Sequence, residues 1–320
     1  MNIFSKFRSN SATPIETSAL PEAVEYIKVP ILKSPQPEYE SVDPPITENE
    51  AKLIEKLKAS TDELLLDLPK EDTSDGYVFD AESWLNDESS LIRYIRARKE
   101  KLEDIKKALI KSLKWRIQYR PHAIKLSDIE IEWRTGKSYF NGFDRHGRPI
   151  LYLRSHLENT KDSDNQIRST VFLMELASKI MPKGVSKMVI ITDLTKLTIM
   201  SSAASPKTST SFLDILQSHY PERLAKAILF NPPSVYVFIY GLLSPFIDNV
   251  TKKKIFFTNI VKQGGKKLVF SKDNETETWT TPQAHFDMDQ FESDFSGNWN
   301  FKYDHDTYIK YFKETFACNN

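Results

Sequence analysis

Apolar side chains recur every three or four residues along the stretch from residue 91 to residue 120. This spacing is typical of amphipathic helices, and it predicts two of them, separated near residues 99–101 and ended by Pro121. Their polar faces are strongly basic, with eleven Lys and Arg against three acidic residues over 91–120. A solvated helix surface and a contact with an anionic partner both explain such a face. The apolar positions are Leu91, Ile95, Leu102, Ile105, Leu109, Leu113 and Ile117.

The chain before these helices has little regular pattern. Residues 1–46 carry seven prolines and no sustained apolar period, so we expect an extended or disordered leader there. A helix is expected to begin at Thr47, because Glu50 three residues later completes a capping-box pattern ahead of an apolar run. Residues 69–90 are acidic and turn-like.

From residue 148 onward, short apolar segments typical of strands alternate with helical segments. Such alternation predicts a mainly parallel sheet with right-handed crossovers. The tail from Tyr303 is expected to form one closing amphipathic helix. The expected strands cover 148–154, 187–193, 225–230 and 254–258, and the expected helices between them cover 166–181, 205–219 and 232–247.

These elements predict an α/β fold in which a helical N-terminal subdomain precedes a lobe built on the parallel sheet. The chain has 320 residues, of which 40% are apolar, and this is ample for a sizeable core. No internal repeat is present. Our interpretation of the domain order is a leader over 1–46, a helical subdomain over 47–125, a sheet lobe over 126–302 and a C-terminal helix over 303–320.

The net charge of the chain is zero, with 44 basic and 44 acidic residues. A dedicated nucleic-acid binder usually shows a strong basic excess, so we expect no nucleic-acid partner. The balance nevertheless conceals an asymmetry. Residues 1–80 hold 16 acidic and 8 basic residues, and the rest of the chain therefore carries a net basic charge of the same size.

Cysteine content and hydropathy favour a soluble intracellular protein. The single cysteine, Cys318, excludes an internal disulfide framework and a multi-cysteine zinc site. No uninterrupted apolar run approaches the roughly 18 residues of a membrane-spanning helix. The first 30 residues also lack the apolar core of a secretory signal.

The motifs of common enzymes on parallel sheets are missing from the sequence. It contains no G-x-G-x-x-G after a strand, no G-x-x-x-x-G-K-[ST] and no G-x-S-x-G. The six histidines form no tight metal-ligand pair, and His305 between Asp304 and Asp306 is better explained as a polar helix cap. Asp193 ends a strand where enzymes of this class often hold a catalytic acid, but it stands alone. We therefore expect no enzyme, no metal and no cofactor.

The segment 232–247 is apolar on every side of the expected helix. Its central run from Val235 to Leu243 is apolar or aromatic except at Gly241. Such a helix is either buried on all sides or in contact with lipid. A central core helix and a lid over an apolar cavity are both open interpretations, and Gly241 and Pro245 would allow a lid to move.

Three lysines follow this segment at positions 252–254, after Thr251. A run of surface lysines is usually only solvated. Ammonium and hydroxyl groups also suit a phosphate, and a phospholipid needs dry walls beside a polar mouth. The position of the lysines next to an apolar helix therefore favours a phospholipid as the ligand.

Four motifs stand in order over roughly residues 85–300 of the chain. They are LIRYIRARK (91–99) with LKWR (113–116), FDRHGRPILYL (143–153), HYPERLAKAILFNPP (219–233) and FIDNVTKKKI (246–255). Together, and in this order, they resemble the motifs of the CRAL-TRIO lipid-binding family. Two further stretches, Ile180–Gly184 and Phe301–Tyr308, are similar to fungal phosphatidylinositol transfer proteins of the azole-resistance-associated branch.

The resemblance implies a lobe that encloses one lipid under a mobile gating helix, and phosphatidylinositol binding and transfer between membranes as the function. It implies a headgroup set of Arg98, Glu222, Thr251 and Lys254. Glu222 has a second explanation as a carboxylate at a helix start after Pro221. The gating residues would be Val235, Tyr236, Phe238, Ile239, Leu242 and Leu243.

This sequence departs from the members of the family that also bind phosphatidylcholine. At the positions of their Ser-x-Thr pair and two tyrosines stand Met188, Ile190, Phe140 and Leu151, which carry no hydroxyl groups. Choline-lipid binding is therefore not expected, and a sterol becomes a second candidate ligand. We expect reversible membrane association from the cytoplasm, at the endoplasmic reticulum, microsomes or lipid droplets. The rival interpretation is a lipid sensor or adaptor that does not transfer its lipid.

Overall fold

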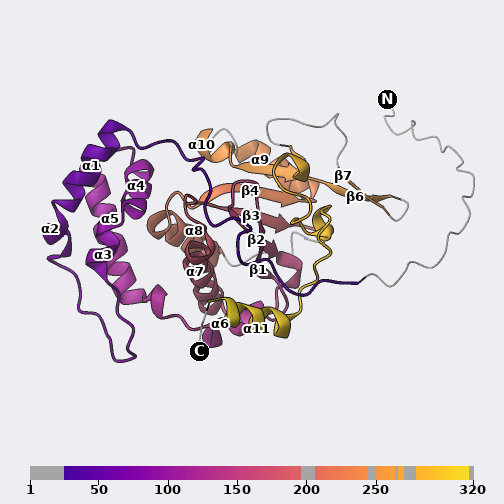
Figure 1. The fold of residues 1–320 in the computed structure, drawn as a ribbon, viewed down its shortest axis with the longest axis horizontal. Helices are drawn as coiled ribbons and strands as arrows, with labels where there is room; N and C mark the ends of the chain where they lie inside the picture. The colour runs from indigo at the N-terminus through magenta and orange to yellow at the C-terminus, as the bar shows by residue number, and fades with distance from the viewer. Residues whose placement is uncertain (1–24, 196–205, 244–248, 264–265, 270–278, 317–320) are drawn as a thin grey trace, which may run out of the picture.

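Helices of the N-terminal part and a sheet lobe lie side by side in the computed structural model (Figure 1). The structure describes residues 25–195, 206–243, 249–263, 266–269 and 279–316. Each of the two parts has its own cluster of buried apolar side chains. This architecture confirms the α/β fold with a helical N-terminal subdomain.

Five helices form the N-terminal part, and three of them were expected from the sequence. Thr47 caps α1 with the reciprocal hydrogen bonds of a capping box, in which Glu50 bonds the backbone N–H of Thr47. The break expected near 99–101 is also present, because Lys99 and Glu100 adopt left-handed φ angles of 50° and 61° between two helices. The helices are α1 (Glu48–Lys58), α2 (Thr61–Leu65), α3 (Ala81–Asn86), α4 (Glu88–Ala97) and α5 (Leu102–Tyr119).

The lobe is built on a five-stranded sheet in the order β1-β2-β3-β4-β5. Strands β2 to β5 are parallel, whereas β1 at the edge pairs antiparallel with β2. All four expected strands are confirmed, and β1 is an addition that the sequence pattern did not indicate. The strands are β1 (Ser138–Phe143), β2 (Pro149–Arg154), β3 (Met188–Asp193), β4 (Leu224–Phe230) and β5 (Ile255–Thr258), with a separate hairpin of β6 (Ile260–Gln263) and β7 (Lys266–Val269).

The helices of the lobe agree with the expected alternation. Helix α9 is shorter than the expected 232–247, and residues 244–248 lie outside the described part of the chain. The helices are α6 (Leu126–Trp133), α7 (Ser163–Ile180), α8 (Pro206–His219), α9 (Ser234–Leu243), α10 (Asn249–Lys252) and α11 (His305–Phe316), with short 3-10 turns η1 (Pro121–Ala123), η2 (Ser155–Leu157), η5 (Pro282–Ala284) and η6 (Ser293–Phe295).

The two faces of the sheet are covered differently. On one face, Tyr152 and Phe230 pack against Phe291 and Phe295, which follow the hairpin in the chain. On the other face, Tyr240 of α9 meets the ring of Phe257 edge-on at 5.0 Å between centroids. Helix α9 therefore covers the second face over its β5 side.

A segment that we call the strap (residues 25–46) runs in extended form over the lobe. Ile27 pairs with Phe301, and Leu32 is buried in the core of the lobe. The backbone N–H of Ile31 donates to Asn141 Oδ1 at 2.8 Å. Near its end, the strap carries Asp43, whose carboxylate pairs with Lys187 Nζ at 2.6 Å. The sequence had suggested a leader separate from the lobe, but buried apolar and hydrogen-bonding groups fix the strap to it.

A buried ion pair joins the helical part to the lobe. Arg116 of α5 contacts Glu175 of α7 at 2.8 Å, and the Tyr220 hydroxyl donates to the same carboxylate at 2.6 Å. Arg116 is 8% exposed. The charge of Arg116 and the hydrogen bonds outweigh the effect of burial, so the pKa of Glu175 is lowered.

A second contact across this boundary involves two stacked rings. His219 of α8 lies parallel to Trp115 of α5, with 4.1 Å between ring centroids. Its Nδ1 atom is 2.9 Å from Ser112 Oγ, which also receives the Tyr94 hydroxyl at 2.8 Å. The interface therefore combines an aromatic stack with buried hydrogen bonds.

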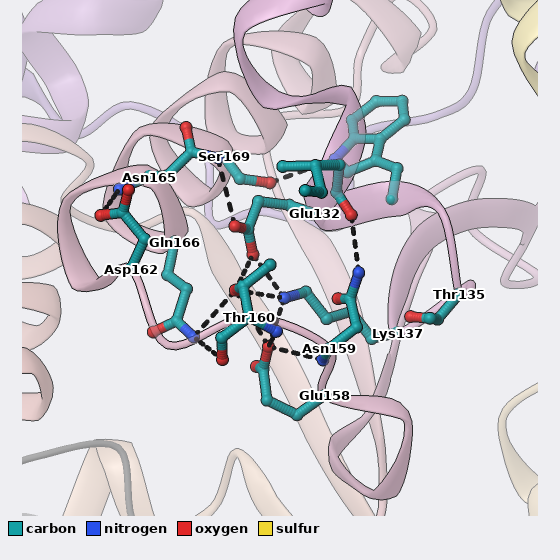
Figure 2. Close-up of polar contacts among 12 residues, drawn as sticks. Glu132, Thr135, Lys137, Glu158, Asn159, Thr160, Asp162, Asn165, Gln166 and Ser169 are labelled. Carbon is teal, nitrogen blue, oxygen red and sulfur yellow. Dashed lines mark hydrogen bonds and ion pairs between the residues drawn. The ribbon is translucent and has the colours of Figure 1, made fainter.

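A polar cluster connects α6, the loop before α7 and α7 itself, as Figure 2 shows. Glu132 is fully buried and pairs with Lys137, which also contacts Glu158. Thr160 Oγ1 and Asn165 Nδ2 donate to Glu132 at 2.9 and 3.2 Å. A buried carboxylate needs such partners to offset its desolvation, so this cluster fixes the start of α7.

We expect acidification to destabilise the protein through His219. Burial and then the charge of Lys111 lower the pKa of His219 to about 4. An unfolded chain holds this group near a pKa of about 6.5 and binds the proton first as the pH falls. The contribution of the neutral imidazole to the free energy of unfolding is therefore fully present above pH ~6.5. About 2 kcal/mol of this contribution is lost when the pH falls to ~5. Urea titrations at the two pH values measure this loss.

The variant His219→Phe keeps a ring against Trp115 and removes the titrating group. Its loss of stability on acidification should be smaller than that of the wild type. The matched control is His146→Phe, which replaces an exposed histidine. Identical pH dependence in the wild type and His219→Phe would show that the buried imidazole is not responsible.

We also expect Asp43→Asn to loosen the strap. Asp43 and Lys187 are only 18% and 17% exposed, and the loss of a partly buried ion pair should destabilise by about 1–2 kcal/mol. Hydrogen exchange of the strap amides measures the effect. The control is Glu38→Gln. Glu38 also lies on the strap, and this substitution removes its exposed 2.9 Å ion pair with Lys183. Equal exchange in both variants would contradict a special role for Asp43.

Candidate functional site

Charged side chains gather where three parallel strands begin. Lys187 precedes β3, Glu222 precedes β4 and Lys254 precedes β5, so parallel pairing brings their starts to one edge of the sheet. Lys254 Nζ lies 3.4 Å from Glu222 Oε2, and Lys187 Nζ lies 4.0 Å from the same oxygen. The left-handed backbone of Glu222, with φ at 56°, directs the chain into β4 at this point.

A cleft of about 330 Å³ opens beside this edge. Its walls are the end of the strap, the outer side of α4 and the loop before β3. The charged residues that line it are Asp43, Glu88, Arg93, Arg96, Lys187 and Glu222. The lining contains three cations and three carboxylates, a mixture that suits a ligand with both an anionic group and hydroxyls.

Neighbouring charges shift the ionisation of groups around the cleft. Burial raises the pKa of Asp43, but hydrogen bonds from Lys187 and Ser186 outweigh it and lower the pKa overall. Burial and then the charge of Arg93 lower the pKa of Arg223 to about 9. Asp43 is therefore held as a carboxylate, while the positive charges of Arg93 and Arg223 repel each other beside the cleft.

Arg93 is the most enclosed cation of the cleft, at 6% exposure. Its three nitrogens donate to neutral oxygens, namely Ser89 O at 3.1 Å, Ser90 Oγ at 3.0 Å and Pro221 O at 3.5 Å. Arg96 instead forms two hydrogen bonds to Glu50, at 2.7 and 3.2 Å. The bond from Arg93 to Pro221 links α4 to the turn that carries Glu222, whereas the bonds from Arg96 link α4 to α1.

The structure brings two of the four expected headgroup residues together. Glu222 and Lys254 are in contact, as described. Arg98 lines a different hollow, at the C-terminal end of α4. Thr251 lies in α10, three residues before Lys254, and its side chain is outside the described part of the structure.

An apolar row crosses the sheet on the face that α9 covers. The strand register aligns one residue of each strand side by side, and none of them carries a polar side-chain atom. The row runs from buried residues on β1 and β2 to half-buried residues on the three other strands. Its members are Phe140, Leu151, Ile190, Ala227 and Ile255.

This row contains three of the four positions at which hydroxyl groups were noted as missing, Phe140, Leu151 and Ile190. The fourth, Met188, begins β3 and is 3% exposed. Ile255, at the other end of the row, directly follows Lys254. The dry face of the sheet therefore joins the charged edge within one residue.

Helix α9 presents apolar side chains to solvent as well as to the sheet. Phe238 is 65% exposed, whereas Val235 and Tyr236 are half-buried. Val250 of the neighbouring α10 is 62% exposed. The side chains of Ile239, Leu242 and Leu243, also expected to gate, lie outside the described part of the structure.

The two groups considered for other chemistry have structural partners. Asp193 Oδ1 accepts from the backbone N–H of Thr195 at 2.9 Å, which closes the turn after β3. His305 begins α11 and contacts Glu130 at 3.1 Å. Within the described residues, no three His, Cys, Asp or Glu side chains are grouped to hold a metal ion. None of the described helices has the length and apolar character needed to cross a bilayer.

Sequence reasoning missed Lys187, Asp43 and Arg93. A lysine just before an apolar strand is usually solvated, and Asp43 lies in a proline-rich segment without any pattern. Arg93 was counted only among the basic residues of a helix face. The one available signal was that Lys187 begins a strand that is expected to be parallel to the strands that follow Glu222 and Lys254.

Comparisons with known proteins agree with this geometry. The family model described as the CRAL/TRIO domain matches residues 134–297. A CRAL-TRIO domain-containing protein of Schizosaccharomyces pombe is 34% identical over 225 residues, which are 70% of this chain and 20% of that protein. The phosphatidylinositol transfer protein PDR17 of Saccharomyces cerevisiae is 31% identical over 236 residues, 70% of this chain and 61% of that protein.

The fold also matches a solved structure. The crystal structure of Sfh5 superposes with a TM-score of 0.51 at 20% identity, covering 67% of this chain and 80% of that one. The chain spans 20% and 61% of the two curated relatives named above. The family is non-enzymatic, in line with the expectation from the missing motifs. The chain belongs to the CRAL/TRIO domain family of lipid-binding proteins.

Proposed function

We propose that this protein binds phosphatidylinositol and transfers it between membranes. The observation that carries the proposal is the direct junction of the apolar row with the charged edge, where Ile255 follows Lys254 in β5. A phospholipid has the same arrangement, with acyl chains joined to a charged headgroup. The 31% identical relative is named a phosphatidylinositol transfer protein, which supports this choice of lipid. The resemblance of Ile180–Gly184 and Phe301–Tyr308 supports the azole-resistance-associated branch.

The physical task of such a carrier is to keep two acyl chains out of water. Each exposed methylene costs about 0.8 kcal/mol, so about 30 of them cost on the order of 24 kcal/mol. The apolar row under α9 would take up these chains. The half-buried state of Ile190 and Ala227 on the inner strands β3 and β4 supports this, because residues at the middle of a fully packed sheet face are normally buried.

The headgroup would bind at the amino ends of β3 to β5. Lys254 and Lys187 would neutralise the phosphodiester, and Glu222 would accept hydrogen bonds from inositol hydroxyls. The family resemblance also implies Thr251 for this set, and Arg98, which lies in the separate hollow at the C-terminal end of α4 rather than at this edge. Lys187 is an addition from the structure, since its Nζ atom shares the Glu222 carboxylate with Lys254.

Helix α9 would act as the gate at the membrane. Its exposed Phe238 and the neighbouring Val250 would enter the interfacial region of a bilayer, and Lys252 and Lys253 would contact lipid phosphates. Exchange would then proceed by docking, displacement of α9, replacement of the lipid and closure. We propose reversible association with the cytoplasmic face of the endoplasmic reticulum, microsomes or lipid droplets. The apolar residues at 140, 151, 188 and 190 favour a sterol as a second ligand.

We expect the double variant Glu222→Ala with Lys254→Ala to transfer phosphatidylinositol at least tenfold more slowly, because it loses the charged contacts of the headgroup, each worth about 1.5–3 kcal/mol. Transfer of labelled lipid between vesicles measures the rate. The matched control is Glu38→Ala with Lys183→Ala, which removes an ion pair of similar length at exposed positions. Wild-type transfer by the first variant would refute the headgroup assignment. Bound lipid without any transfer by the wild type would favour a sensor.

We expect Phe238→Ser to slow transfer by roughly five- to thirty-fold, since an aromatic side chain that enters the bilayer gains about 1–2 kcal/mol from burial. The lipid that copurifies with the variant should be unchanged in amount. Leu66→Ser is the control, because Leu66 is 80% exposed on the helical subdomain. Equal effects of the two substitutions would mean that α9 is not the membrane-facing element.

A further inference from the structure

A second hollow, of about 400 Å³, lies at the turn between α4 and α5. Five cationic side chains and one acidic side chain, Asp104, line it, together with the small residues Ala97, Ala108 and Ser218. We call its cationic lining the basic groove. Its members are Arg98, Lys99, Lys101, Lys107 and Lys111.

The fold of the turn brings these cations to one place. Lys107 and Lys111 lie four residues apart in α5, so they share one face of that helix. Lys99 and Glu100 have left-handed backbone angles, which reverse the chain and set Lys99 and Lys101 beside that face. The concentration of positive charge is therefore a property of the folded turn as well as of the sequence.

The cations of the basic groove have few counter-ions. Elsewhere on the same subdomain, Lys52, Lys58 and Lys106 each have a carboxylate at 2.6–2.7 Å. Within the described residues, Lys99, Lys101 and Lys107 form no ion pair. Lys111 alone in the groove contacts an acid, Asp214 at 3.2 Å. The groove thus presents unneutralised charge that an extended anionic partner would neutralise.

We propose that the basic groove docks this protein onto the anionic surface of a lipid bilayer, apart from the site that holds the transported lipid. The inference rests on the proposed lipid-carrier function only in requiring a bilayer as partner. Charge complementarity supports the assignment, because juxtamembrane clusters of Lys and Arg bind anionic headgroups. A bilayer is favoured over nucleic acid because the whole chain has no net charge and exposes Phe238 and Val250 for apolar contact.

The size of the effect follows from the number of cations. Each Lys or Arg close to an anionic membrane changes the partition coefficient by about fivefold. Three lysines removed together should therefore weaken binding by about a hundredfold. Salt should weaken the wild type in the same way, because the Debye length falls from about 10 Å at 0.1 M to about 3 Å at 1 M.

The test is cosedimentation of the full chain with vesicles that contain about 30% phosphatidylserine, which gives the vesicles an anionic surface. The variant is Lys99→Glu with Lys101→Glu and Lys107→Glu, which leaves Arg98 of the headgroup set intact. The control is Lys56→Glu with Lys310→Glu and Lys313→Glu, three exposed lysines outside the groove. We expect the variant to lose binding by at least about a hundredfold, since each substitution removes a positive charge and adds a negative one, and the control to lose much less.

Further measurements separate this inference from the transfer function. Native mass spectrometry of the purified groove variant should show the same bound lipid as the wild type, which checks both its fold and its lipid pocket. Replacement of the three lysines by arginine should retain vesicle binding. Equal loss in variant and control, or unchanged binding of the groove variant, would overturn the proposal. Failure of phosphatidylinositol transfer by the wild type would refute the proposed function but leave the vesicle-binding result interpretable.

Discussion

The buried pair of Arg116 and Glu175 is the constraint on which the geometry of the site depends. It joins α5 to α7, and the Tyr220 hydroxyl completes it. Tyr220 is two residues before Glu222, so the same interaction fixes the turn that delivers the carboxylate to the edge of the sheet. Removal of either charge would leave the other buried without a partner, which is strongly destabilising. The helical subdomain therefore positions the site without having to contribute its central residues.

The parallel sheet creates both halves of the site from one geometric rule. Strands that begin at one edge place their preceding residues together, which gathers Lys187, Glu222 and Lys254. The same register lines up apolar residues across the strands. The charged edge and the apolar row are thus adjacent wherever a charged residue directly precedes an apolar strand, as Lys254 precedes Ile255.

Local patterns predicted most of the elements but little of the long-range packing. The capping box at Thr47, the break after α4 and the parallel strands depend on neighbouring residues, and the structure confirms them. Strand β1 was missed because Asn141 and Gly142 are typical of turns. Asn141 is nevertheless fully buried, since it bonds Glu292, 151 positions later, at 2.8 Å. No local pattern contains that partner.

The candidate site was predictable to a similar extent. The resemblance pointed to Glu222 and Lys254, which the structure brings into contact. Asp43 and Lys187 are 144 positions apart in the chain, and only the fold makes them neighbours. Arg96 lines the cleft, but Arg98 lines a separate hollow. Two residues two positions apart at the end of a helix lie on nearly opposite sides of it, so both arginines do not face the same site.

The strap also has a consequence for the order in which the protein is made. It is synthesised well before its partners, since Ile27 pairs with Phe301 and Lys28 contacts Asp304, 276 positions later. These partners do not exist until synthesis has passed residue 304. Because contacts of such large sequence separation form late, we expect the strap to pack onto the lobe only after the lobe itself has folded. The wall that it gives to the cleft, with Asp43, is therefore among the last parts to be completed, and a shortened chain would lack it.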